Sequence, residues 1–312
     1  MCRAYGGIKM TDKTSEIVRL FLDHIKNRDL SDATKYAFEQ SINRCLTLLE
    51  EAERTTDPRL ITAEDILYLK NTAMCNMELV TRRYYLSFLK QLTEFCGNRA
   101  FDEVDIHWRL DQRTNVDWLQ TADSRRLLAD RTNTVPQRMA VILELTMGLR
   151  RVEIIRLTLD KIYPDHIVVI GKGSGGGKPR TVPVSKQFVE LLPSFHAYRQ
   201  GIILDAIGRN GGEPIEVPDN LYLCIRGKKL CRYSEHGVGF DKAYVIPVRE
   251  RMGISYCNHT LRRTFGRQLW KNGAEVETIA KILGHENTKT TLNYIGANLD
   301  DMKSAINLLS FD

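Results

Sequence analysis

The sequence predicts a mainly α-helical protein of the α+β class, in which a small antiparallel β-hairpin interrupts a largely helical chain. Three observations support this prediction. Apolar residues recur at helical spacing through the first hundred residues, a strand–turn–strand pattern lies near the middle, and helical patterns continue from residue 258 to the end. The 312 residues, 43% of them hydrophobic, suffice for one large domain or two of ordinary size.

The N-terminal hundred residues predict a bundle of helices. Apolar residues within 17–49 define the first two helices by their spacing. Thr62, followed three residues later by Asp65, resembles a capping box, although Glu or Gln is the usual partner. A longer helix is predicted for residues 78–96, and Gly97 suits its C-terminal cap.

A domain boundary is predicted near residue 110, where helical periodicity stops. Residues 98–118 are charged and polar with isolated apolar side chains, which is typical of a linker. The predicted organisation is an N-terminal extension over residues 1–11, a helical domain over 12–98, a linker over 99–116 and a second domain over 117–312.

The second domain is predicted to begin with a helix over residues 117–130. Pro136 suits the first turn of the next helix, which runs up to Gly148. The apolar segments 167–170 and 181–184 flank a glycine-rich stretch, and together they predict the hairpin.

Composition limits the classes of function. The net charge is +6 and the isoelectric point is near 8.9, which is compatible with a polyanionic partner but weak evidence alone. The seven cysteines include no Cys-x-x-Cys pair, so neither a disulfide framework nor a structural zinc site is expected. The chain has no apolar run of about 18 residues, and its first residues lack the apolar core of a signal peptide. A cytoplasmic protein that does not enter membranes is therefore expected.

The first chemical motif is Gly148-Leu149-Arg150-Arg151-Val152-Glu153. A planar guanidinium group matches the nonbridging oxygens of a phosphate through paired hydrogen bonds, which makes Arg150 a candidate ligand for a phosphodiester. Glu153 lies three residues later, on the same face of a helix, and could hold Arg150 in place. Taken alone, this motif is better explained as a surface ion pair.

The second motif is Asn258-His259-Thr260-Leu261-Arg262. With Asn258 as the N-cap, His259 and Arg262 project from one face of the first helical turn. A helix N-terminus favours a bound phosphate, so an imidazole and a guanidinium would face the same anion. His259 could accept a proton there or donate a hydrogen bond to a phosphoryl oxygen.

The third motif joins His285, in Leu283-Gly284-His285, to Tyr294 nine residues later. Gly284 suits the C-cap of a helix over residues 275–283, and a histidine after the cap either faces a cleft or caps the helix. A phenol with a pKa of about 10 needs activation before it attacks. Neighbouring arginines and histidines would supply a suitable environment for Tyr294.

These motifs in this order resemble the tyrosine recombinases, the phage integrase family. The resemblance is close over residues 117–297 and looser over 12–97, which resembles the family's helical DNA-binding domain. It implies that residues 117–312 form the catalytic domain, with a C-terminal helix. It also implies double-stranded DNA with a specific recombination site as the partner, self-association into a tetramer on DNA, and no metal or other cofactor.

By this resemblance Tyr294 is the nucleophile and forms a 3′-phosphotyrosine with release of a 5′-hydroxyl. Arg150 and Arg262 would bind the phosphate oxygens. His259 would assist as a base or hydrogen-bond donor, and His285 would complete the contacts to the oxyanion.

The resemblance also assigns a supporting role to Glu153 and the role of general acid to a lysine in the hairpin. Lys172 matches that lysine, but the turn after it is longer than usual, so Lys178 remains an alternative acid. Glycines in the same loop match a dinucleotide-binding fingerprint, yet a strand rather than a helix follows, and this argues against a nucleotide site.

Several basic residues are candidate DNA contacts, although a solvated charged surface would look similar in sequence. Such residues mostly bind phosphates and add affinity with little sequence information. The candidates are Lys35, Arg82, Arg83, Arg226, Lys228 and Lys229, and a second basic cluster comprises Arg262, Arg263, Arg267 and Lys271.

Residues 300–312 predict a short amphipathic helix, which either docks on a neighbouring protomer or packs on its own domain. Two other functions stay open on the sequence: a type IB topoisomerase with the same phosphotyrosine chemistry, and a DNA-binding regulator without catalysis. The sequence does not distinguish integration, excision and dimer resolution, and it gives neither the DNA site nor whether Tyr294 acts in its own protomer.

Overall fold

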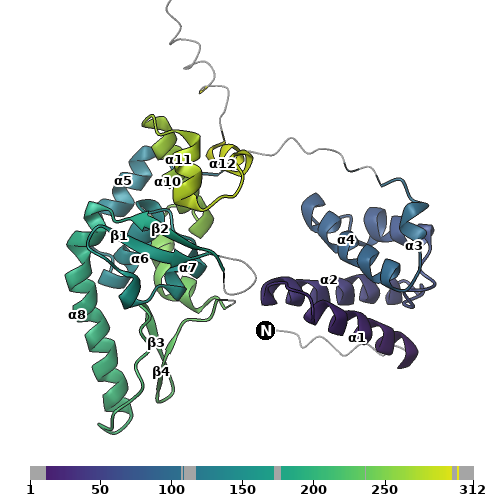
Figure 1. Ribbon diagram of the computed structural model, residues 1–312, viewed down its shortest axis with the longest axis horizontal. Coiled ribbons are helices and arrows are strands. Elements are labelled where there is room, and N and C mark those ends of the chain that lie inside the picture. The colour runs from purple at the N-terminus through teal and green to yellow at the C-terminus, as the bar shows by residue number, and fades with distance from the viewer. Residues whose placement is uncertain are drawn as a thin grey trace, which may run out of the picture. The chain divides into compact units, whose positions relative to one another are not determined.

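The computed structural model describes residues 12–106, 108, 117–171, 177–235, 237–296 and 301. The chain separates into two compact units, one built mainly on residues 1–112 and the other mainly on residues 113–312 (Figure 1). Most of the described residues lie in helices, and the strands form two small antiparallel hairpins. The predicted α+β class, mainly helical with a small hairpin, is therefore confirmed.

The N-terminal unit is entirely helical in its described part. Its elements are α1 (Asp12–Lys26), α2 (Asp32–Glu50), α3 (Ala63–Tyr68), the π-helical turn η1 (Leu69–Ala73), α4 (Leu79–Phe95) and the 3-10 turn η2 (Ala100–Asp102). Helix α2 packs against α1 and α4. Thr62 and Asp65 form the predicted capping box at the start of α3, and Gly97 has a left-handed φ of 78° after α4.

The apolar residues after α4 belong to the core of the N-terminal unit. Ala100 and Phe101 are buried in this core, and Val104, Ile106 and Trp108 pack against it. The first half of the region predicted as a linker, residues 99–116, therefore contributes to a folded core because its isolated apolar side chains all find partners there.

The C-terminal unit is mostly helical around one large core. Its helices are α5 (Thr121–Ala129), α6 (Val135–Leu145), α7 (Arg151–Arg156), α8 (Lys186–Arg209), α9 (Ile246–Met252), α10 (Asn258–Lys271), α11 (Val276–Leu283) and α12 (Thr288–Ile295), with short turns η3 (Leu159–Lys161) and η4 (Asp241–Val245). Its strands are β1 (His166–Ile170), β2 (Pro179–Pro183), β3 (Leu223–Arg226) and β4 (Lys229–Arg232).

The helix predicted over residues 117–130 begins later, at Thr121. The chain before it is held in another way, because the Leu119 amide donates to the Thr264 hydroxyl of α10 at 2.8 Å. Gln120 accordingly has extended backbone angles at the N-cap of α5.

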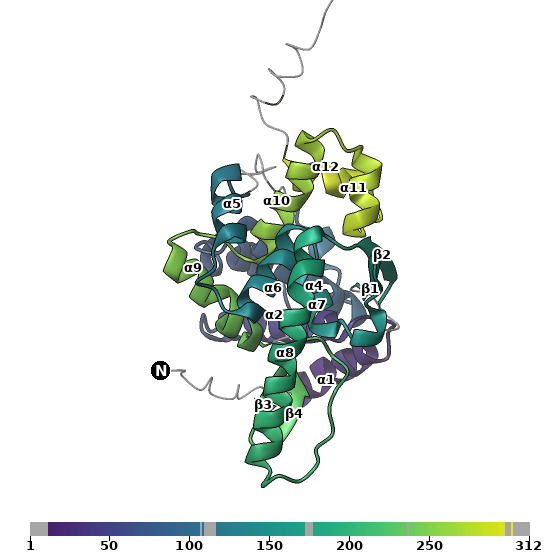
Figure 2. The same cartoon turned by 90° about the vertical axis from the view of Figure 1, so that its left-hand side faces the viewer.

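The predicted hairpin is confirmed as β1–β2, with Val168 paired to Thr181. A second hairpin, β3–β4, does not follow from the sequence pattern. It lies beside α8 in both views of the ribbon (Figures 1 and 2). Basic residues at its turn interrupt the apolar alternation that marks a strand, and this hides the hairpin in the sequence.

No helix in the described part of the chain is long and apolar enough to cross a lipid bilayer. The amphipathic helix predicted at the C-terminus lies outside the described residues, except for Asp301.

Candidate active site

The buried carboxylate of Glu153 organises the basic residues of the candidate site. Glu153 is fully buried in α7, and its Oε1 accepts a hydrogen bond of 2.9 Å from Arg150 Nη1. Its Oε2 accepts a second bond of 2.7 Å from the Arg150 backbone amide. The predicted support of Arg150 by Glu153 is thus present as a contact, and it fixes both the side chain and the N-cap of α7.

Arg180 of β2 is a second partner of Glu153, which the motifs of the sequence do not include. Its Nη1 donates to Glu153 Oε1, and its Nη2 donates to Oε2 at 2.9 Å. Its Nε donates to the Ile282 carbonyl of α11 at 2.8 Å, so one guanidinium joins the hairpin to α7 and α11. A basic residue in the outgoing strand of the hairpin is the only signal of it in the sequence.

Arg262 of α10 is the third arginine of this group and is completely buried. Its Nη1 and Nη2 donate to the carbonyls of Gly148 and Leu283, and Nη1 lies 3.6 Å from Glu153 Oε2. Burial and the charge of Arg150 lower the pKa of Arg262 to about 9. The guanidinium therefore stays charged at neutral pH.

The group carries an excess of positive charge. Three guanidinium groups face one carboxylate, which leaves a formal charge of three minus one, or +2. Burial alone would raise the pKa of Glu153, but the hydrogen bonds and charge of Arg180 outweigh it and lower that pKa. Arg262 Nε is also buried without a hydrogen-bond partner among the described atoms. Both features suit an anion.

Two glycines form tight turns next to these arginines, where no side chain fits. Gly148 has a φ of 65°, and a Cβ there would lie 2.4 Å from Phe265 Cδ1. Gly284 has a φ of 63°, and a Cβ there would lie 2.8 Å from Arg180 Cδ. Only glycine accepts both the left-handed backbone and the lack of space at these turns.

Tyr294 and His259 meet at the edge of this group. His259 lies in the first turn of α10 and Tyr294 in the last turn of α12, and Tyr294 Oη lies 3.2 Å from His259 Nδ1. The guanidinium carbons of Arg263 and Arg262 lie 5.4 Å and 6.0 Å from the centre of the phenol ring. The phenol thus has a base within reach and positive charge around it.

The predicted N-cap of α10 was wrong by one residue. Cys257 occupies the cap and shares a capping box with Thr260, while the Asn258 side chain donates to Asp241 at 2.8 Å. His259 and Arg262 nevertheless lie in the first turns of the helix, as predicted.

His285 faces the same site. Its backbone amide donates to the Ala280 carbonyl and caps α11, while its ring contacts the Tyr294 ring edge-on at 5.1 Å between centroids. Its Nδ1 lies 2.9 Å from the Thr291 hydroxyl. Burial and the charges of Arg262 and Arg150 lower the pKa of His285 to about 4. The imidazole is therefore neutral at pH 7 and serves as a hydrogen-bonding group.

Of the two candidate acids, the structure describes one. Lys172 lies outside the described residues. Lys178 is highly exposed and pairs with Glu286, the neighbour of His285, and this hydrogen bond raises the pKa of Lys178. At the base of the loop, Arg156 Nη1 donates to the Gly171 carbonyl at 2.9 Å.

The candidate DNA contacts of the hairpin lie at the β3–β4 turn. Arg226, Lys228 and Lys229 are all exposed there. The four residues of the second basic cluster are divided, because Arg262 and Arg267 are buried and make internal contacts. Arg263 is half-buried and Lys271 is exposed, so a DNA-facing surface at this cluster stays a prediction for these two residues.

The candidates in the N-terminal unit are less uniform. Arg83 is exposed in the first turns of α4. Arg82 is half-buried and its Nη1 donates to the Lys70 carbonyl at 3.4 Å. Lys35 Nζ donates to the Lys26 carbonyl at 2.7 Å and so caps α1. For Arg82 and Lys35, internal contacts compete with a phosphate.

Within the described part of the chain, no group of three or more His, Cys, Asp or Glu side chains is arranged to hold a metal ion.

Comparisons with known proteins identify the family of this chain. The model of the phage integrase family matches residues 117–300. The chain is 27% identical over 289 residues to tyrosine recombinase XerC of Thermodesulfovibrio yellowstonii, covering 89% of this chain and 91% of that protein. It is 26% identical over 286 residues to tyrosine recombinase XerD of Listeria monocytogenes, covering 86% and 90%.

Solved structures show the same fold. The Tn1549 transposon integrase in complex with a circular intermediate DNA has a TM-score of 0.63 and 17% identity, covering 95% of this chain and 99% of that chain. A lambda integrase dimer bound to a COC′ core site has a TM-score of 0.60 and 15% identity, covering 96% and 99%. The chain belongs to the phage integrase family, the tyrosine recombinases.

Proposed function

We propose that this protein is a site-specific DNA recombinase that cleaves and rejoins double-stranded DNA through a 3′-phosphotyrosine. The observation that carries the proposal is the phenol of Tyr294, 3.2 Å from His259 Nδ1 and beside a group of arginines with a formal charge of +2. Family membership and the recombinase relatives support the same reaction.

In the cleavage step, Tyr294 Oη attacks the phosphorus of a phosphodiester. The phenol proton passes to His259 Nδ1, and the bond from phosphorus to the 5′-oxygen breaks. Arg150 and Arg262 bind the nonbridging oxygens as negative charge develops there. The departing 5′-oxygen takes a proton from Lys172, with Lys178 as the alternative acid.

Glu153 and Arg180 hold in place the arginines that bind the phosphate oxygens. Glu153 holds Arg150 through its side chain and its amide, and Arg180 holds Glu153 through both oxygens. His285 donates or accepts as a neutral imidazole, because its pKa of about 4 prevents it from adding charge. The arginines are thus oriented before DNA arrives, which lowers the cost of organising the transition state.

Rejoining reverses the same step on a new partner strand. A free 5′-hydroxyl attacks the phosphotyrosine, and the number of phosphodiester bonds is unchanged. No nucleotide hydrolysis is required because the covalent intermediate keeps the bond energy.

The assembly we propose is a tetramer on two copies of a specific DNA site, acting in the cytoplasm. The helical residues 12–98 would bind DNA on one side and residues 117–312 would carry out the reaction, with a linker over 99–116. Arg226, Lys228 and Lys229 at the β3–β4 turn would contact phosphates because all three are exposed and unobstructed by the core of the unit.

A suicide substrate tests the proposal. The substrate is DNA of the host or of the mobile element, carrying random nicks. When cleavage occurs beside a nick, the short strand diffuses away and cannot be rejoined, which traps the covalent complex. The trapped fragments are then sequenced. The wild-type protein is expected to form adducts at one recurrent sequence, and Tyr294→Phe is expected to form none. Absence of adducts with the wild type would indicate a DNA-binding regulator.

Relaxation of supercoiled DNA that lacks the recurrent sequence would instead favour a type IB topoisomerase. A plasmid with two copies of the mapped sequence provides the complementary assay. The recombinase proposal predicts exchange between the copies and little relaxation of a plasmid without them.

A further inference from the structure

Arg267 of α10 holds the end of the helix that carries Tyr294. Its side chain is only 3% exposed. Its Nη1 donates to the Ile295 carbonyl at 2.9 Å and to the Gly296 carbonyl at 3.0 Å. Ile295 is the last residue of α12 and follows Tyr294 directly.

The second terminal nitrogen of the guanidinium binds a carboxylate. Arg267 Nη2 donates to both oxygens of Asp301, at 2.9 Å and 2.7 Å. One planar group therefore joins the end of α12 to the chain five residues further on. A cation at this position also interacts favourably with the negative end of the helix dipole.

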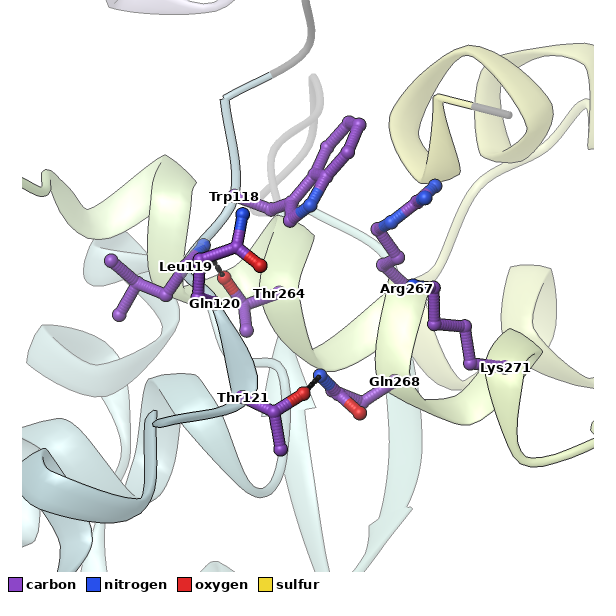
Figure 3. Close-up of a pocket in the computed structure, with 8 residues that line it drawn as sticks. All are labelled: Trp118, Leu119, Gln120, Thr121, Thr264, Arg267, Gln268 and Lys271. Carbon is purple, nitrogen blue, oxygen red and sulfur yellow. Dashed lines mark hydrogen bonds between the residues drawn. The ribbon is translucent and has the colours of Figure 1, made fainter. Parts of the chain in front are cut away.

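The start of the C-terminal unit completes the arrangement. The guanidinium carbon of Arg267 lies 3.8 Å from the ring centre of Trp118 and 5.8 Å from that of Trp270. Figure 3 shows Trp118 and Arg267 bordering one small pocket, with Thr121 hydrogen-bonded to Gln268 below them. The guanidinium is thus fixed in direction by stacking as well as by hydrogen bonds.

Helix α12 needs such support. It spans only eight residues and is capped by Gly296, whose backbone is left-handed. A helix this short is marginal without tertiary contacts. Its orientation sets the position of Tyr294 Oη relative to His259 and the arginines.

We propose that Arg267 is a positioning residue for the nucleophile: it fixes the C-terminal end of α12 and so places Tyr294 for attack on the phosphorus. The inference rests on the proposed function, because it concerns the tyrosine of that reaction. Because its side chain is buried, Arg267 acts through α12 rather than on the substrate, and its effect is confined to steps that use the phenol.

A pair of reactions separates this role from general support of the fold. The first is cleavage of the suicide substrate, which needs Tyr294. The second is ligation of a strand that ends in a 3′-(4-nitrophenyl phosphate). This ligation is run with Tyr294→Phe added to the wild type and to each variant, so 4-nitrophenol leaves only as a 5′-hydroxyl attacks the phosphorus, and the arginines and histidines are used without the phenol.

The test compares Arg267→Met with the wild type in the full-length protein, at saturating DNA. Arg267→Met is expected to lower the single-turnover cleavage rate about 10- to 100-fold, which is the usual cost of a misplaced reactive group. DNA affinity and the ligation rate on the nitrophenyl substrate are expected to stay within about twofold. Arg267→Lys keeps the charge but loses the planar pair of donor groups, so its cleavage rate is expected to lie between those of the wild type and Arg267→Met.

A matched control removes another arginine from an ion pair at a helix end. Arg209 pairs with Asp205 on the exposed surface of α8, so Arg209→Met is expected to change neither reaction. If Arg267→Met fails to fold, Asp301→Asn replaces it, because this change removes only the carboxylate from the contact. It is expected to slow cleavage while the ligation rate and the DNA affinity stay unchanged.

Equal loss of both reactions in a folded Arg267 variant, or unchanged cleavage in both the Arg267→Met and Asp301→Asn variants, would overturn the inference. Failure of the proposed function looks different, because the wild type itself would then form no adduct.

Discussion

Glu153→Gln changes the charge at the centre of the site and little else. The side chain is fully buried and accepts hydrogen bonds from Arg150 and Arg180, with Arg262 Nη1 3.6 Å away. The amide has nearly the same volume, so no cavity forms. The fully buried Arg262 and the partly buried Arg150 and Arg180 would then remain with no carboxylate among them.

The expected cost follows from that burial. Removing one partner of a buried ion pair destabilises a protein by about 3–5 kcal/mol, because the remaining charge is left without compensation. The amide oxygen still accepts one hydrogen bond, which places Glu153→Gln near 3 kcal/mol, the lower end of this range. Cleavage should fall as well, since Arg150 loses the group that orients it.

The pH dependence gives a second signature. The pKa of Glu153 is lowered in the folded protein by Arg180 and Arg262, against the opposing effect of burial. A carboxyl group of this kind stabilises fully above its unfolded pKa of about 4.5, and the contribution disappears as the pH falls through the lower folded pKa. The difference between the wild type and Glu153→Gln should therefore shrink below about pH 4.5.

Urea denaturation followed by tryptophan fluorescence measures this difference. A Trp108→Phe background leaves Trp118 and Trp270, both in the C-terminal unit, as the only tryptophans of the chain. Glu190→Gln is the matched control, because Glu190 is exposed and forms a loose pair with Lys186. The control should change stability by less than about 0.5 kcal/mol.

The reasoning would be refuted if Glu153→Gln were as stable as the control near neutral pH. It would also be refuted if a large destabilisation stayed constant as the pH fell well below about 4.5, since the lost interaction would then not depend on charge.

Three further predictions concern the residues around this centre. Gly284→Ala should lower the stability by about 1 kcal/mol or more and should also lower the cleavage rate, because the φ of Gly284 is left-handed and the new Cβ would displace Arg180. Thermal unfolding measures the stability, and suicide-substrate kinetics measure the cleavage rate. The ring signals of His285 in NMR should stay constant from about pH 8 to about pH 5.5 and titrate only near its lowered pKa of about 4, whereas a midpoint near 6.5 would contradict the geometry. If Lys172 is the general acid, Lys172→Ala should cleave slowly and Lys178→Ala should cleave normally. A 5′-sulfur leaving group needs no proton, so it should restore cleavage by Lys172→Ala and leave Lys178→Ala unchanged. If both variants are defective and the sulfur rescues neither, the general-acid role fails for both lysines.

The sequence predicts best those features of the fold and the site for which both the residue types and their spacing along the chain are informative. The helical class and the β1–β2 hairpin are confirmed, and so is the capping box of Thr62 and Asp65. The order and spacing of the motifs are enough to indicate the family. The contact between His259 and Tyr294 joins residues 35 positions apart, and only the family resemblance anticipates it.

Other features depend on tertiary contacts that leave no local pattern. Arg180 lies 27 residues from Glu153, in a strand whose alternation gives no sign of a buried ion pair. Arg267 has the sequence pattern of one more basic residue on a DNA-facing helix, yet it is enclosed by Trp118 and the end of α12. Burial of a charged side chain is set by distant partners, so sequence spacing cannot reveal it.

The central claim is that Tyr294 forms the covalent bond to DNA. Protease digestion of the trapped complex, followed by mass spectrometry, identifies the residue that carries the nucleotide and the end of the strand that is attached. The account predicts a peptide containing Tyr294 linked to a 3′-phosphate, with a free 5′-hydroxyl on the released strand. A nucleotide on any other residue, or attachment through a 5′-phosphate, would contradict it.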